Sequence, residues 1–192
     1  MEYHLQTPLK NEDIKKLNVG DIVYISGEVL TARDEAHSRI LEMDEKGEKL
    51  PFSLKGAVIY HCGPLMQQTE NGWKVISAGP TTSGRMSKMT HSLLKAHEVR
   101  VIIGKGGMEC IASEMKNRCV YLAYTGGCAA LASKLIQEVK TVHWFDLGMP
   151  EAVWVLRVEE FGPLIVGIDS NGNDIFGKVR ERAEKVLENR KR

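Results

Sequence analysis

A polar loop at residues 77–86, SAGPTTSGRM, lies between an apolar run and a helical pattern. Thr81 and Thr82 supply two hydroxyls, and Arg85 offers a planar guanidinium fork that suits a carboxylate. None of these groups is an acid or base near neutral pH. A threonine hydroxyl moves a proton only when a neighbour activates it or when cations stabilise its charge. The loop therefore predicts anion binding, and proton transfer if further groups assist.

A second loop, GKGG at residues 104–107, adds the ammonium of Lys105 as a point charge. Phosphate is the rival ligand for a loop of this kind. However, GKGG lacks the GxxxxGK[ST] spacing of a phosphate-binding loop, and Glu109 stands where a dinucleotide fingerprint has its third glycine. These departures argue against nucleotide binding.

A third group of charged residues, RDEAH at residues 33–37, follows a β-rich run directly. On a helix, Arg33 and His37 lie one turn apart, and Asp34 and His37 are also neighbours. The spacing alone favours an ordinary exposed helix start with charge pairs. Its position after an apolar strand keeps a binding role open, because the two loops above occupy the same kind of position.

The elements that must position these loops follow a repeated order. Three segments each begin with an apolar β-rich run that ends in glycine or threonine, and a helix is expected to follow at once. This alternation predicts an α/β fold with a largely parallel centre. Ligands of such sheets bind at the carboxyl ends of the strands, where helix N-termini favour anions. The loops GPTTSGR, GKGG and TGG are therefore expected to converge on one pocket. The three segments are residues 74–96, 99–115 and 119–139.

The remaining elements complete a single domain, expected to span residues 1–192. Gly27 is expected to interrupt the first long β-rich run, and Asn11 to cap the first helix. The expected elements are a helix over 11–17, β-rich chain over 21–32, a helix over 33–43, strands over 56–64, 73–79, 152–158 and 163–169, and a terminal helix over 174–190.

Composition excludes several classes of function. The 26 basic and 25 acidic residues are well mixed and give a net charge of +1, which leaves no electrostatic footprint for nucleic acid. The apolar runs are too short to cross a bilayer, and no signal peptide pattern is present, so a soluble cytoplasmic protein is expected.

The four cysteines match no zinc or ferredoxin spacing. They are expected to be reduced thiols in small apolar gaps, with Cys62 the best placed to line a pocket. Since the chain offers no evident Lewis acid or redox centre, any active site is expected to be completed elsewhere. The cysteines are Cys62, Cys110, Cys119 and Cys128.

Four stretches in this order, GEVLTARDEAH, YHCGP, SAGPTTSGRM and GKGG, closely resemble the class I fumarate hydratases. The likeness is to their C-terminal half, which in many organisms is a separate β subunit, and it runs from about Leu5 to the terminal helix. It implies a swivelling β/β/α domain with a mixed sheet and helices. It also implies a partner α subunit that binds a four-iron, four-sulfur (4Fe-4S) cluster, the missing Lewis acid, while this chain binds no metal and is inactive alone.

The resemblance also implies roles for single residues. Arg33 and Arg85 fall on arginines that bind the substrate carboxylates. Thr81 falls on the threonine that moves the carbon-bound proton, helped by an aspartate of the α half, and Lys105 on a lysine that reaches the substrate. Thr82 is expected at the substrate-binding loop, where it orients the loop and does not react.

Asp34 and His37 belong to the same motif and are expected to support it. The implied reaction is the reversible hydration of fumarate to (S)-malate, a step of the tricarboxylic acid cycle, in a homodimer or heterotetramer. The L(+)-tartrate dehydratase β subunit is the alternative, because RDxAH and TTxxR serve both enzymes. Gly107 and Met108 depart from the polar residue common after GKG and leave the substrate open. A free-standing carboxylate-binding module is the alternative from another class.

Overall fold

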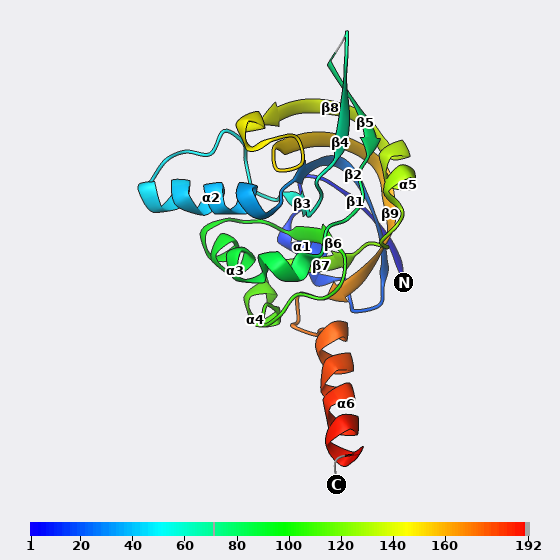
Figure 1. The fold of residues 1–192 in the computed structure, drawn as a ribbon. Helices are drawn as coiled ribbons and strands as arrows, with labels where there is room; N and C mark the ends of the chain where they lie inside the picture. Colours follow the sequence, from blue (N-terminus) through cyan, green and yellow to red (C-terminus); the bar gives the residue numbers. More distant parts are fainter. Residues whose placement is uncertain (71, 191–192) are drawn as a thin grey trace.

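The computed structural model describes residues 1–70 and 72–190, and a closed β-barrel forms their centre (Figure 1). Seven strands form one sheet in the order β1-β2-β3-β6-β7-β9-β8, and an additional β2–β9 pairing closes β2, β3, β6, β7 and β9 into the barrel. Strands β4 and β5 form a separate hairpin. The strands are β1 (Glu2–Gln6), β2 (Ile22–Thr31), β3 (Val58–Tyr60), β4 (Leu65–Thr69), β5 (Gly72–Ser77), β6 (Val101–Gly104), β7 (Val120–Ala123), β8 (Ile136–His143) and β9 (Val153–Ile168).

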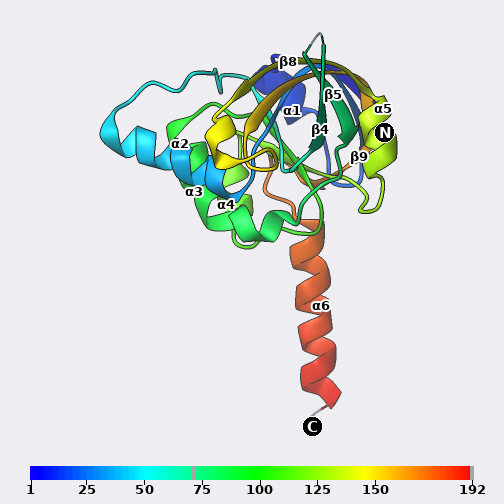
Figure 2. The same cartoon turned by 45° about the horizontal axis from the view of Figure 1, so that its top comes forward.

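Helices α2, α3 and α4 cover one flank of the barrel, while α6 projects away from the body in both views (Figures 1 and 2). No residue of α6 is buried. Within the part of the chain that the structure describes, no helix has the length and apolar character needed to cross a membrane. The helices are α1 (Asn11–Lys15), α2 (Asp34–Lys46), α3 (Ser87–Ala96), α4 (Ala112–Met115), α5 (Ala129–Lys134) and α6 (Ile175–Arg190), with 3₁₀ turns η1 (Ser83–Met86) and η2 (Phe145–Leu147).

The prediction of a mixed α/β fold with a parallel centre is confirmed. Strands β1, β2, β3, β6 and β7 pair in parallel, and β9 runs antiparallel to both β7 and β2. Side chains alternate across the barrel wall, as the pleat requires. Val101 and Ile103 pack inside the barrel, whereas Ile102 packs with Leu93 of α3 on the outside. Both faces of the parallel strands are thus covered, which explains their continuous apolar runs.

The expected strands over 152–158 and 163–169 form one long strand, β9, so their separation was wrong. Its pairing with β2 skips a residue on the β9 side between the pairs Ile25–Phe161 and Gly27–Val158. Glu160 lies in this interval and has a left-handed backbone, with φ 49°. An extra residue of this kind bends a strand without ending its pairing, so β9 curves around the barrel.

Three further predictions of secondary structure need correction. The helix expected at the end of 119–139 stops at Lys134, and β8 begins at Ile136 because this segment pairs with β9. The helix after GKGG begins only at Ala112. Asn11 is the first residue of α1, and Lys10 precedes it in the capping position.

Candidate functional site

The loop that follows β5 is held between the carboxyl ends of β3 and β6. The Thr81 N–H donates to the His61 carbonyl at 2.7 Å, and the Lys105 N–H donates to the Thr81 carbonyl at 3.1 Å. The Ser83 N–H in turn donates to the Lys105 carbonyl at 3.1 Å. Thr82 and Lys105 form a parallel bridge, so residues 81–83 extend the sheet. The backbones that carry Thr81 and Lys105 are therefore fixed side by side.

The TGG loop after β7 lies against the same two loops. The Tyr124 N–H donates to the Gly104 carbonyl at 2.7 Å, and the Ala78 N–H donates to the Ala129 carbonyl at 3.1 Å. A side chain at Gly79 would stand only 2.9 Å from the Ala129 Cβ, which makes glycine the residue that fits this approach. The expected convergence of the three loops is confirmed.

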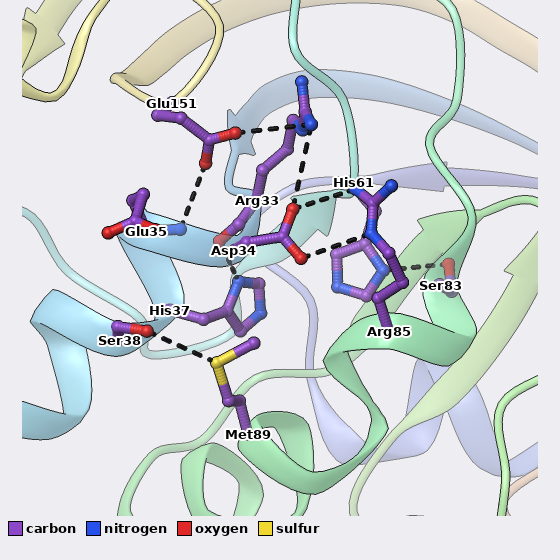
Figure 3. A network of polar contacts seen from close by, with 10 residues as sticks. All are labelled: Arg33, Asp34, Glu35, His37, Ser38, His61, Ser83, Arg85, Met89 and Glu151. Atoms are coloured by element: carbon purple, nitrogen blue, oxygen red, sulfur yellow. Dashed lines mark hydrogen bonds and ion pairs between the residues drawn. The ribbon is translucent and has the colours of Figure 1, made fainter.

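The Asp34 carboxylate lies between two guanidinium groups (Figure 3). Arg85 donates to both of its oxygens, from Nε at 3.2 Å and from Nη2 at 2.8 Å. Arg33 Nη2 lies 3.7 Å from the same carboxylate. Arg33 has an extended backbone just before α2, and Asp34 is the first residue of that helix. The space between the guanidinium groups of Arg33 and Arg85 thus accommodates one carboxylate, that of Asp34.

Glu151 is a member of this charge cluster that the sequence did not indicate. Its Oε1 lies 3.3 Å from Arg33 Nη2, and its Oε2 accepts the Glu35 N–H at 3.0 Å. A carboxylate at a helix N-terminus accepts a hydrogen bond from a free N–H, and the helix dipole stabilises its negative charge. A side chain at Gly63 would collide with the Arg33 guanidinium. Glu151 and Gly63 together restrict where Arg33 can lie.

His37 is fully buried beneath this cluster, and its Nδ1 lies 2.8 Å from the Arg33 carbonyl. Because a carbonyl only accepts, Nδ1 carries the hydrogen. The ring of His61 meets it edge-on, with ring centroids 5.1 Å apart (Figure 3). Burial lowers the pKa of His37, and it lowers the pKa of His61 well below its usual range. Burial therefore favours the neutral form of both rings.

These two histidines predict a stability that falls in mild acid. Unfolded histidines take up protons below a pH of about 6.5, whereas the lowered pKa values of His37 and His61 shift this uptake to lower pH in the folded chain. The unfolded state therefore binds more protons in this range. The contribution of the two histidines to the free energy of unfolding is fully present above that pH, and it is lost as the pH falls toward their lowered pKa values. The two groups together give a slope of up to about 2.7 kcal/mol per pH unit. Urea unfolding at pH 7.5, 6.0 and 5.0 measures this slope.

The variant His61→Asn serves as the internal comparison for this prediction. It removes one of the two buried titrations, so the pH slope of the free energy of unfolding is expected to fall to about half, whatever the stability at pH 7.5. An unchanged slope in this variant would contradict the assignment of the slope to the buried pair.

The candidate site is an open face of the chain. Thr81 and Lys105 are half-buried, while Thr82 and Arg85 are exposed. A cavity of about 630 Å³ lies elsewhere on the barrel, and none of these groups lines it. The loops converge as expected, but on a surface and not on an enclosed pocket. A second surface is needed to exclude water from it.

The cysteines do not provide a metal site. Among residues 1–70 and 72–190, no three His, Cys, Asp or Glu side chains are grouped so that they could hold a metal ion. All four thiols are free, and burial raises the pKa of Cys62 and Cys119, which keeps them protonated. Since an iron–sulfur cluster needs thiolate ligands, the residues of this chain do not fit one.

Comparison with known proteins gives one family. The profile described as Fumarase C-terminus matches residues 1–179. A Methanocaldococcus jannaschii protein, provisionally named L(+)-tartrate dehydratase subunit beta, is 47% identical over 190 residues, 97% of each chain. The L(+)-tartrate dehydratase subunit beta of Escherichia coli is 38% identical over 98% of this chain and 95% of its own.

A third relative carries the other name. A Geobacillus stearothermophilus protein, provisionally named fumarate hydratase class I, is 38% identical over 95% of this chain but only 35% of its own length. The resemblance seen in the motifs is thus confirmed at the level of the family, although the two relatives above that match along nearly their whole length carry the tartrate name. With its profile matched over nearly the whole chain, the protein belongs to the fumarase C-terminus family.

Proposed function

We propose that this chain is the β subunit of a two-subunit iron–sulfur hydro-lyase that removes water from L(+)-tartrate. The geometry supports a dicarboxylate substrate, because Arg33 and Arg85 meet at one carboxylate, Asp34. The two relatives named for L(+)-tartrate dehydratase match from end to end and favour that substrate. This replaces fumarate, which the motifs alone favoured.

The residues of this chain have distinct roles in the proposal. Arg33 and Arg85 bind the substrate carboxylates and fix its orientation, which makes the elimination stereospecific. After the Thr81 hydroxyl has passed its own proton to an aspartate of the partner α subunit, its oxygen takes the proton from the carbon adjacent to the one that loses the hydroxyl. The electron pair of that C–H bond forms the C=C bond. Lys105, whose backbone is held beside that of Thr81, stabilises the negative charge on the threonine oxygen before that oxygen accepts the proton.

A partner subunit supplies what this chain lacks. Its iron–sulfur cluster would provide the Lewis acid that stabilises the hydroxide as the C–O bond breaks. The open face at Thr81, Arg85 and Lys105 is where the partner would cover the substrate. This chain alone is then inactive, since neither the Lewis acid nor the exclusion of water is present.

Fumarate hydration is the second candidate, because the Geobacillus relative is as similar, at 38% identity, as the tartrate enzyme subunit of E. coli. The two substrates differ at the carbon that loses the proton, where tartrate carries a second hydroxyl. The groups placed at the site serve both reactions.

The test is an anaerobic affinity purification of the chain from its native cells, followed by assays with L(+)-tartrate, malate and fumarate. A second, iron-containing polypeptide and a higher kcat/KM for L(+)-tartrate than for malate are expected. A higher value for malate and fumarate would replace tartrate by fumarate. A chain recovered alone, with carboxylate binding but neither iron nor activity, would favour the binding module and overturn the proposal.

A further inference from the structure

A buried chain of polar groups lies directly beneath the proposed reacting groups. His61 Nδ1 lies 2.8 Å from Ser83 Oγ, which lies 3.2 Å from the Tyr121 hydroxyl, and that hydroxyl lies 2.8 Å from the Gly106 carbonyl. The three side chains are fully buried. His61 directly follows β3, Ser83 lies in the loop that bears Thr81, and Tyr121 lies on β7. The carbonyl of Gly106 belongs to the GKGG loop.

The direction of these hydrogen bonds follows from the groups themselves. The Gly106 carbonyl can only accept, so the single Tyr121 hydroxyl proton goes to it. Ser83 then donates to the Tyr121 oxygen and accepts from His61 Nδ1. This assignment gives each of the three contacts its own hydrogen and requires that Nδ1 of His61 carries one. In the neutral form, which the pKa lowered by burial favours, the single ring hydrogen is then on Nδ1.

The chain of contacts joins the two loops whose side chains the proposed reaction uses. Ser83 follows Thr81 by two residues and precedes Arg85 by two, and Gly106 is adjacent to Lys105. An alanine and a phenylalanine in place of Ser83 and Tyr121 would fill nearly the same volume. Packing therefore does not account for the polar groups of these three buried side chains, which incur a desolvation penalty unless they are hydrogen-bonded.

We propose that His61, Ser83 and Tyr121 are positioning residues that set the Lys105 side chain against Thr81. The inference rests on the proposed function and adds to it residues that do not touch substrate. Gly104 belongs to the same arrangement, because any side chain there would collide with the Ser83 hydroxyl. A displacement of about 1 Å between reacting groups lowers a rate by roughly 100-fold, so the loss of one contact is expected to lower kcat/KM by about 10- to 100-fold.

The test is a double-mutant cycle in the assembled enzyme. Ser83→Ala is expected to lower kcat/KM by about 10- to 100-fold when Lys105 is present, but by less than about 3-fold in the Lys105→Met background. An equal loss in both backgrounds would mean that Ser83 only supports the fold, and would overturn the proposal. Ser133→Ala is the matched control, because this hydroxyl donates to the Ala130 carbonyl on α5, away from the network.

Two variants of His61 distinguish the role of its Nδ1 from that of its Nε2. Asparagine places an N–H near the position of Nδ1, so His61→Asn is expected to retain kcat/KM within about 3-fold. Glutamine reaches the position of Nε2 and leaves Ser83 without its donor, so His61→Gln is expected to resemble Ser83→Ala. Equal losses in both variants would show that the Nδ1 contact has no special role.

Amide hydrogen exchange of the full chain tests the network without any assay of activity. The amides of Thr81, Ser83 and Lys105 are all hydrogen-bonded across the loops. Their exchange is expected to be about 10-fold faster in Ser83→Ala than in Ser133→Ala. Faster exchange in Ser83→Ala, together with no dehydration activity of the wild-type complex, would contradict the proposed function but support the network. Unchanged exchange in Ser83→Ala would contradict the network and leave the proposed function untouched.

Discussion

Replacing Thr81 by alanine is expected to lower kcat of the assembled enzyme by about 100- to 10,000-fold, the range that proton transfer by a positioned side chain contributes. KM is expected to change by less than about 3-fold, because Arg33 and Arg85, the residues proposed to bind the carboxylates, remain. The backbone of Thr81 is fixed by the His61 carbonyl and the Lys105 N–H, neither of which needs the side chain. Steady-state kinetics with L(+)-tartrate measures both parameters.

Two further variants, at Thr82 and at Thr81 itself, test whether the loss of kcat is due to the Thr81 hydroxyl. Thr82→Ala removes an exposed hydroxyl one residue away and is expected to change kcat far less than Thr81→Ala does. Thr81→Ser keeps the hydroxyl and should retain much of kcat. If Thr81→Ala kept normal kinetics, or if Thr82→Ala proved the more damaging, the proton-transfer role of Thr81 would be wrong.

The order of strands and loops was predictable because local rules agree along most of the chain. Buried parallel strands leave continuous apolar runs, and each run ends in turn residues. The rule failed at residues 135–139, where a helical pattern continues from α5 but the chain pairs with β9. The pairing partner lies far along the sequence, so only tertiary contact decides between helix and strand there. For the same reason the bend at Glu160 was not foreseen.

The site shows the same division between local and distant information. Short motifs at strand ends contain Arg33, Thr81, Arg85 and Lys105, so the sequence alone was enough to propose roles for these residues. Glu151 contacts Arg33 from a remote loop, and no motif marks it. In the sequence, nothing distinguishes Tyr121 from the other residues of its apolar strand.

Ser83 and His61 stood inside stretches that were already of interest, but their side-chain contacts depend on how the loops pack. Sequence thus indicates the groups proposed to meet the substrate more readily than those proposed to hold them in place.

Replacing Arg85 by methionine is expected to raise KM by about 10- to 100-fold while changing kcat much less. A hydrogen bond to a charged group contributes about 1.5–3 kcal/mol, and this guanidinium can offer two to a carboxylate. Arg85 is half-exposed and free to exchange Asp34 for a substrate carboxylate, so the loss falls on binding. Kinetics with L(+)-tartrate, and binding of a non-reacting dicarboxylate by calorimetry, measure it.

The chain contains its own control for the loss of an arginine–aspartate pair. Arg39 also donates to both oxygens of one aspartate, Asp146, from Nη1 at 3.0 Å and from Nη2 at 2.7 Å, but it lies outside the motifs of the site. Arg39→Met is therefore expected to leave KM within about 2-fold of the wild type, even where it lowers stability. Arg85→Lys keeps the charge but not the planar fork and should restore only part of the affinity. Equal KM values for Arg85→Met and Arg39→Met would mean that Arg85 does no more than hold Asp34, and the substrate carboxylate would have to be bound elsewhere.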